Sequence, residues 1–182
     1  MESLKFPVIN DDLIHAERYQ IPIIVQQTNC CTIRGHGLSQ YISDKLGVNP
    51  YIQRRPDPSS KTPQNCAHPE DRPHPGTIQL MIGTSNLYVV NMYAQYSPGK
   101  PNIGGRYPVY VNEFGIENYD SPEFRQHWFR LCCQQLHKFL ISQKITQVGV
   151  PYQIGCGLAG GNWEIYSQIL KDELPETIIF KL

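Results

Sequence analysis

The densest run of glycines in the chain lies between a short apolar strand and a helix, and it restricts the fold more than any other feature. Four glycines fall within residues 155–161, after an apolar stretch at 147–150 and before a helix predicted from Trp163. One or two glycines would suit a tight turn. Four let successive backbone N–H groups face one point beside the positive end of a helix, so we predict a phosphate-binding loop.

The spacing Gly155-x-Gly157-x-x-Gly160 also fits the dinucleotide-binding fingerprint. In that fold the loop follows the first strand, and an acidic residue lies about 20 positions further on, at the end of the second strand. Here only 22 residues follow Gly160, and Glu176 precedes the last predicted strand. The position of the loop in the chain therefore argues against a nicotinamide or flavin enzyme.

Apolar periodicity places the other elements around this loop. Strands are predicted at 21–27, 77–82, 87–93, 147–150 and 177–182, and helices at 38–46, 122–140 and 163–174. The strands at 77–82 and 87–93 should form a hairpin. Strands and helices alternate at both ends of the chain, so we expect a mixed sheet between helices.

The length of 182 residues predicts a single domain spanning 1–182. Long proline-rich loops are expected at about 51–76 and 97–119. These loops have two possible roles, as a lid over a ligand or as a cover for the edge of the sheet.

The charge balance excludes some partners. The chain has 16 Lys plus Arg and 16 Asp plus Glu, whereas a protein that binds a nucleic-acid backbone or an anionic membrane normally carries a basic excess.

No basic stretch followed by an apolar one opens the sequence, and no apolar run is long enough for a membrane span. We expect a soluble intracellular protein, cytoplasmic or nuclear. We also expect reduced cysteines, because the pairs Cys30-Cys31 and Cys132-Cys133 are adjacent in sequence and do not easily bridge internally. We expect no metal site, because Cys66, His68 and His74 lack a Cys-x-x-Cys pair and a second ligand cluster.

A second candidate loop, at 26–38, also joins a strand to a helix. Gly35 and Gly37 flank His36, so the backbone can approach a ligand closely. Asn29 follows the strand and offers a donor and an acceptor. Its amide either contacts a ligand or closes its own loop, and the spacing does not decide between the two.

These segments together resemble the macro domain family. The resemblance rests on the loop after Asn29, the strand at 88–95, and above all the Ile-Gly-Cys-Gly-Leu run at 154–158 with Trp163 on the next helix. It extends over essentially the whole chain. The sequence is most similar to the compact branch with the terminal ADP-ribose protein glycohydrolases and the yeast-type ADP-ribose-1''-phosphate phosphatases.

The resemblance implies a three-layer α/β/α sandwich with a mixed central sheet that binds ADP-ribose across the strand ends. Asp12 would accept from the adenine amino group, the loop at 155–161 would hold the diphosphate, and the loop at 29–38 would hold the distal ribose. Phe180 would lie near the adenine, although core packing is the alternative for a phenylalanine in a strand. The implied binding residues are Asp12, Leu13, Asn29, Gly35, Gly37, Leu38, Gly155, Cys156, Gly157, Leu158, Ala159, Gly160, Gly161 and Phe180.

Three residues are candidates for catalysis. Lys45 holds the position of the lysine that attacks the distal ribose in the glycohydrolases of this branch, but Ala159 stands where those enzymes have an aspartate. Gln26 stands where the phosphatases have a histidine. Asn29 and His36 remain as groups that could activate water.

The resemblance leaves two functions open. The first is hydrolysis of an ADP-ribose derivative: a protein-linked ADP-ribosyl ester, O-acetyl-ADP-ribose or ADP-ribose-1''-phosphate. The second is a non-catalytic module that reads ADP-ribose or a related nucleotide signal. In either case we expect a monomer without cofactor, with ADP-ribose, its derivative or an ADP-ribosylated protein as partner.

Overall fold

The computed structural model describes residues 6–60, 65–101 and 105–182. Its main sheet has the strand order β1-β8-β7-β2-β4-β3, with every neighbouring pair parallel except β3 and β4. The strands are β1 Val8–Ile9, β2 Ile23–Asn29, β3 Ile78–Ile82, β4 Tyr88–Gln95, β7 Val148–Pro151 and β8 Thr177–Phe180. The predicted hairpin is confirmed as the antiparallel pair β3 and β4.

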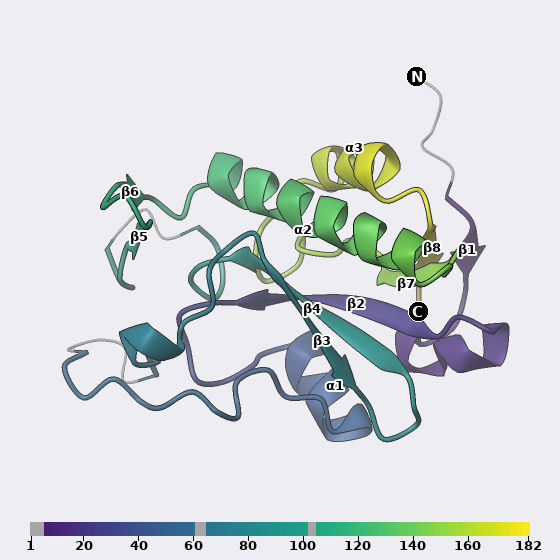
Figure 1. Cartoon of the computed structure of the whole chain (residues 1–182), viewed down its shortest axis with the longest axis horizontal. Helices are drawn as coiled ribbons and strands as arrows, with labels where there is room; N and C mark the ends of the chain where they lie inside the picture. Colours follow the sequence, from purple (N-terminus) through teal and green to yellow (C-terminus); the bar gives the residue numbers. More distant parts are fainter. Residues whose placement is uncertain (1–5, 61–64, 102–104) are drawn as a thin grey trace.

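Helices cover both faces of this sheet (Figure 1). The 3-10 helix η1, Leu13–Tyr19, and α1, Leu38–Leu46, lie on one face, and α2, Pro122–Ser142, and α3, Trp163–Glu173, lie on the other. The predicted α/β/α sandwich with a mixed sheet is therefore confirmed.

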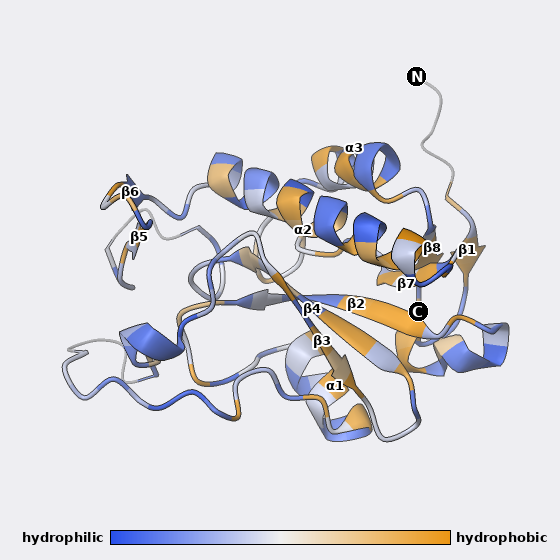
Figure 2. Ribbon diagram, in the orientation of Figure 1, coloured by the Kyte–Doolittle hydropathy of each residue, from blue (hydrophilic) through white to orange (hydrophobic). Residues whose placement is uncertain are grey.

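Alternation along the central strand explains the layers. Ile23 and Val25 of β2 pack toward α2 and α3, whereas Ile24 between them packs toward η1 and α1. Successive side chains of a strand point to opposite faces, so the apolar first half of β2 must be covered on both. Figure 2 shows the apolar colour on much of β2 and β4, while α2 alternates between apolar and polar turns.

The helix boundaries follow from local chemistry. The Ser121 hydroxyl caps α2 by accepting from the Phe124 N–H at 3.1 Å, with Pro122 in the first turn. Gly47 ends α1 in the left-handed conformation, with φ of +69°. Asn162 caps α3 by accepting from the Glu164 N–H at 2.9 Å.

Two elements of the sandwich were absent from the prediction. Strand β1 is only two residues long and pairs with β8, so it carries no readable alternation. Helix η1 begins after Asp12, whose side chain accepts from the Ile14 N–H. Both are held by the far end of the chain, a contact that no local pattern shows.

The proline-rich loops pack against the sheet. Residues from both loops join a buried cluster that contains Cys31, Cys66, Tyr96 and Trp128, with Tyr110 beside it. The 97–119 loop contains a small hairpin of β5, Tyr110–Val111, and β6, Glu117–Asn118. The 51–76 loop contains the single 3-10 turn η2, Pro69–Asp71, in its described part. Across the described ranges, no helix combines the length and apolar character needed to cross a membrane.

Candidate functional site

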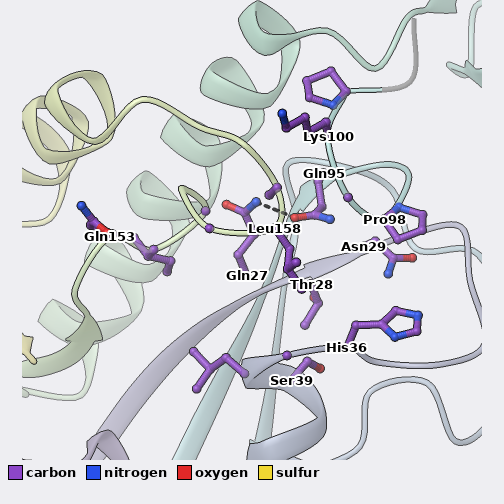
Figure 3. A pocket seen from close by; sticks show the side chains of 18 of the residues that line it. Gln27, Thr28, Asn29, His36, Ser39, Gln95, Pro98, Lys100, Gln153 and Leu158 are labelled. Atoms are coloured by element: carbon purple, nitrogen blue, oxygen red, sulfur yellow. Dashed lines mark hydrogen bonds between the residues drawn. The ribbon is translucent and has the colours of Figure 1, made fainter. Parts of the chain in front are cut away.

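A cleft of about 760 Å³ opens at the carboxyl ends of β2, β4 and β7. This is the edge at which α/β sheets bind ligands. Figure 3 shows the cleft from close by. Its lining residues are Gln27, Thr28, Asn29, His36, Gly37, Leu38, Ser39, Tyr51, Gln95, Pro98, Gly99, Lys100, Pro101, Arg106, Tyr107, Pro151, Tyr152, Gln153, Ile154, Gly155, Gly157, Leu158 and Ala159.

The glycine-rich loop forms one wall, and two of its glycines are sterically required. A Cβ on Gly155 would lie 2.5 Å from Gln27 Oε1, and φ at this residue is +73°. A Cβ on Gly161 would lie 2.6 Å from the Gly155 carbonyl oxygen, which accepts the Gly161 N–H at 2.9 Å. The loop is thus folded tightly onto β2 and leads directly into the N-terminus of α3.

A buried arginine joins the two sides of the cleft. Arg125 of α2 is 2% exposed and pairs with Asp120, with Nε to Oδ1 and Nη2 to Oδ2 distances of 2.6 Å. Its Nη1 donates to the carbonyl oxygens of Gly99 at 2.6 Å and Ala159 at 3.1 Å. One guanidinium group therefore fixes the segment after β4 against the glycine-rich loop.

The side chain of Asn29 closes its own loop. Its Oδ1 accepts from the Cys31 N–H at 3.1 Å, the Thr32 N–H at 2.8 Å and the Thr32 hydroxyl at 2.9 Å. Arg54 reinforces this turn, since its Nη1 donates to the carbonyl oxygens of Asn29 at 3.0 Å and Thr32 at 2.7 Å. The amide oxygen of Asn29 is thereby occupied within the protein.

The charge of the lining is one-sided. Lys100 and Arg106 line the cleft, and none of its described lining residues is Asp or Glu. The stem of Lys100 packs on the glycine-rich loop, because a Cβ on Gly160 would lie 3.0 Å from Lys100 Cγ. Cationic side chains without carboxylates make a cleft suited to an anion.

Solved structures match the chain along its whole length, although no family model and no curated protein matches it by sequence. A protein of unknown function from Bacteroides thetaiotaomicron is 23% identical, with both chains fully covered and a TM-score of 0.61. The macrodomain of Thermus aquaticus DarG is 13% identical, with 98% of each chain covered and a TM-score of 0.60. A Streptomyces coelicolor macrodomain protein is 12% identical, with 98% of this chain and 99% of that chain covered and a TM-score of 0.57. The chain has the macrodomain fold.

Half of the residues that the sequence assigned to the macrodomain site line the cleft. They are Asn29, His36, Gly37, Leu38, Gly155, Gly157, Leu158 and Ala159. The two candidate loops meet there, because a Cβ on Gly37 would lie 3.3 Å from Leu158 Cδ1. His36 is exposed at one end of the cleft (Figure 3).

The other assigned residues lie outside the lining. They are Asp12, Leu13, Gly35, Lys45, Cys156, Gly160, Gly161 and Phe180. The Asp12 carboxylate accepts from the Tyr41 hydroxyl, which raises the pKa of Tyr41. Lys45 is exposed near the end of α1, with Nζ 5.9 Å from the Tyr41 ring centre. Phe180 is 3% exposed and packs in the core beside Tyr19, with ring centres 5.9 Å apart.

Several lining residues were not foreseen from the sequence. Tyr51 comes from the first proline-rich loop, and Lys100 and Arg106 come from the second, so both loops contribute to the cleft. No local motif marks them. The proline content of the sequence predicted the two loops, but their position at the strand ends depends on the tertiary fold.

Proposed function

We propose that the cleft binds ADP-ribose or a derivative of it, with the diphosphate against the loop at 155–161. The observation that carries this proposal is the charge of the cleft, whose described lining holds Lys100 and Arg106 but no carboxylate. Backbone amides at a helix N-terminus and flanking cations are the usual partners of a diphosphate. A macrodomain from Oceanobacillus iheyensis with ADP supports it, at 11% identity and a TM-score of 0.50 over all of this chain and 86% of that one.

Asp12 and Phe180, which lie outside the lining, would then be near the adenine. We propose that the adenine lies toward Asp12, whose two oxygens accept from the Ile14 N–H and the Tyr41 hydroxyl. A carboxylate has lone pairs left after two such bonds and could accept from the adenine amino group. Tyr152 lines the cleft beside Phe180, since its N–H donates to the Phe180 carbonyl oxygen at 2.8 Å.

A thermal shift measurement tests the binding proposal. ADP-ribose at a hundredfold excess over its Kd should stabilise the protein by about 2.7 kcal/mol, and raise the melting temperature by several degrees. ADP should act in the same direction, whereas ribose alone should not. Unchanged melting with both nucleotides would contradict the proposal.

Hydrolysis of the bound derivative is a second candidate function, and the position of His36 favours it. The His36 imidazole lies in the lining and has a ring nitrogen that can accept a proton from water, whereas the described lining includes no Asp or Glu and Lys45 lies outside it. The substrates to test are a protein-linked ADP-ribosyl ester, O-acetyl-ADP-ribose and ADP-ribose-1''-phosphate, the derivatives cleaved in the branch that the sequence resembles.

Three variants separate the catalytic alternatives. If His36 activates water, His36→Ala should reduce turnover by about 10²-fold or more, whereas Lys171→Ala on the surface of α3 should not. Loss of turnover in Lys45→Ala alone would instead favour attack by that lysine. Absence of turnover in the wild type, together with binding, would identify a reader of ADP-ribose.

A further inference from the structure

Strand β3 is an open edge of the main sheet. It pairs with β4 on one side, and no strand from the described ranges pairs with its other side. β1 lies at the opposite edge of the sheet (Figure 1). That strand is only two residues long and follows Pro7, so it offers few backbone groups for pairing. β3 is therefore the longer of the two edges.

The bonds between β3 and β4 determine which backbone groups of the edge are left over. The two strands are joined at Thr77 and at Gly83 by backbone hydrogen bonds of 3.0 and 2.8 Å. Bonded residues alternate along an antiparallel pair, so every second residue between these two also faces β4. Ile78, Leu80 and Ile82 therefore direct their N–H and C=O groups away from the sheet. Within the described part of the chain, nothing hydrogen-bonds to these groups.

This edge lacks the usual protection against pairing. Proteins normally protect an edge strand with charged side chains, proline or a bulge. The sequence of β3 is Ile-Gln-Leu-Met-Ile, and all five residues pair with β4 in continuous register. No Asp, Glu, Lys or Arg occurs between Arg72 and Lys100, so the whole β3–β4 hairpin is free of these charges. Nothing in this sequence opposes the approach of another strand.

An apolar strip lies along the same edge. Leu80 and Ile82 are 41% and 56% exposed, and Tyr88, which pairs with Ile82 from β4, is 41% exposed. These side chains are on the α2 face of the sheet, because Ile78 in the same alternation packs against the core cluster beneath α2. Exposed apolar side chains gathered beside unpaired backbone groups indicate an interaction surface.

We propose that β3 pairs antiparallel with β3 of a second copy of the chain, about a two-fold axis at Leu80. In this register Leu80 lies opposite its own counterpart, and Ile78 lies opposite Ile82 of the second copy. The residues whose backbone faces outward in one copy then meet the same residues in the other, so each N–H and C=O gains a partner.

The side chains match in the same register. Leu80, Ile82 and Tyr88 of both copies form one continuous apolar strip, because residues directly opposite each other share a face of the sheet. A neutral edge meets a neutral edge without repulsion, whereas a charged partner finds no complementary group on β3. The dimer replaces the monomer expected from the sequence. It does not depend on the proposed function, since no residue of β3 lines the cleft.

Sedimentation equilibrium of the full chain over a range of concentrations tests the proposal. The mass of the wild type should rise toward twice 20.8 kDa. Leu80→Lys should weaken dimerisation by about tenfold or more, because it removes an apolar contact from each copy and places two like charges opposite each other. Ile165→Lys on α3 is the matched control, since Ile165 is 39% exposed, and this variant should dimerise as the wild type does.

Amide hydrogen exchange of the wild type gives a second measurement that needs no variant. The Leu80 N–H should become protected as the protein concentration rises, whereas the Val90 N–H, within the sheet between β2 and β3, should be protected throughout. A monomeric wild type at millimolar concentration would overturn the proposal, as would a dimer that persists in folded Leu80→Lys. Equal weakening by Leu80→Lys and Ile165→Lys would assign association to net charge and overturn it too.

Discussion

The guanidinium group of Arg125 donates to the carbonyl oxygen of Ala159 across 3.1 Å, although the two residues are 34 positions apart in the sequence. The same Nη1 atom reaches the Gly99 carbonyl oxygen. Arg125 thus joins the two walls of the cleft, although its own side chain is not part of the lining.

Arg125→Met should destabilise the fold by about 3–5 kcal/mol, because it leaves the buried Asp120 carboxylate without its cation. Urea unfolding followed by fluorescence measures this change. Arg130→Met is a matched control on the same helix, since its ion pair with Glu173 is partly exposed and should contribute no more than about 1 kcal/mol. Equal losses in the two variants would show that the buried network has no special role.

The glycine-rich loop offers a pair of substitutions that differ only in position. Gly155→Ala should destabilise the protein and abolish nucleotide binding, because the new Cβ would lie 2.5 Å from Gln27 Oε1 and 2.7 Å from the Tyr166 ring at a positive φ. Gly157→Ala should leave the melting temperature near that of the wild type, since no atom lies within 4 Å of its Cβ position. Differential scanning fluorimetry of both variants tests the geometry of the loop. Similar melting temperatures would contradict it.

Lys100 should contribute charge to nucleotide binding. Lys100→Gln should weaken ADP binding by roughly tenfold at low salt, the effect of one charge-assisted hydrogen bond. The loss should shrink as salt is added. Lys138→Gln on the outer part of α2 is the control of equal charge. An effect of the same size in both variants would assign the change to net charge rather than to the cleft.

Stability at low pH should depend on Asp11. Its carboxylate accepts from the His15 ring at 2.9 Å and from the Tyr19 hydroxyl at 2.9 Å, and these bonds, led by the one from His15, lower its pKa to about 2. A carboxyl group whose pKa is lowered in the folded state stabilises the fold at pH values above its ordinary pKa, near 3.9 for Asp. This contribution to stability disappears as the pH falls toward 2. Asp11→Asn should therefore melt below the wild type at pH 6, and the gap should close between pH 4 and pH 2. A gap that is independent of pH would exclude the carboxylate as its cause.

The sequence was informative where the signal is local. The central strands, the capped start of α2 at Ser121 and the stop of α1 at Gly47 all follow from periodicity and capping within a few residues. Strand β1 and helix η1 could not be foreseen in this way, because β1 pairs with the last strand and η1 packs against it.

The same difference between local and tertiary signals holds for the residues of the site. The two glycine-bearing loops were recognisable, but spacing could not decide whether Asn29 faces a ligand or its own turn. In the structure its Oδ1 makes three bonds within the turn, while the residue also lines the cleft. Tyr51 and Arg125 reach the cleft region from 22 or more residues away. Their roles depend on tertiary distances that no motif encodes.

Calorimetric titration of the wild-type chain with ADP-ribose tests the central claim most directly. The account predicts saturable binding at one site per chain, competed by ADP and lost in Gly155→Ala. No heat of binding with ADP-ribose at millimolar concentration, in protein that melts cooperatively, would contradict the assignment of the cleft.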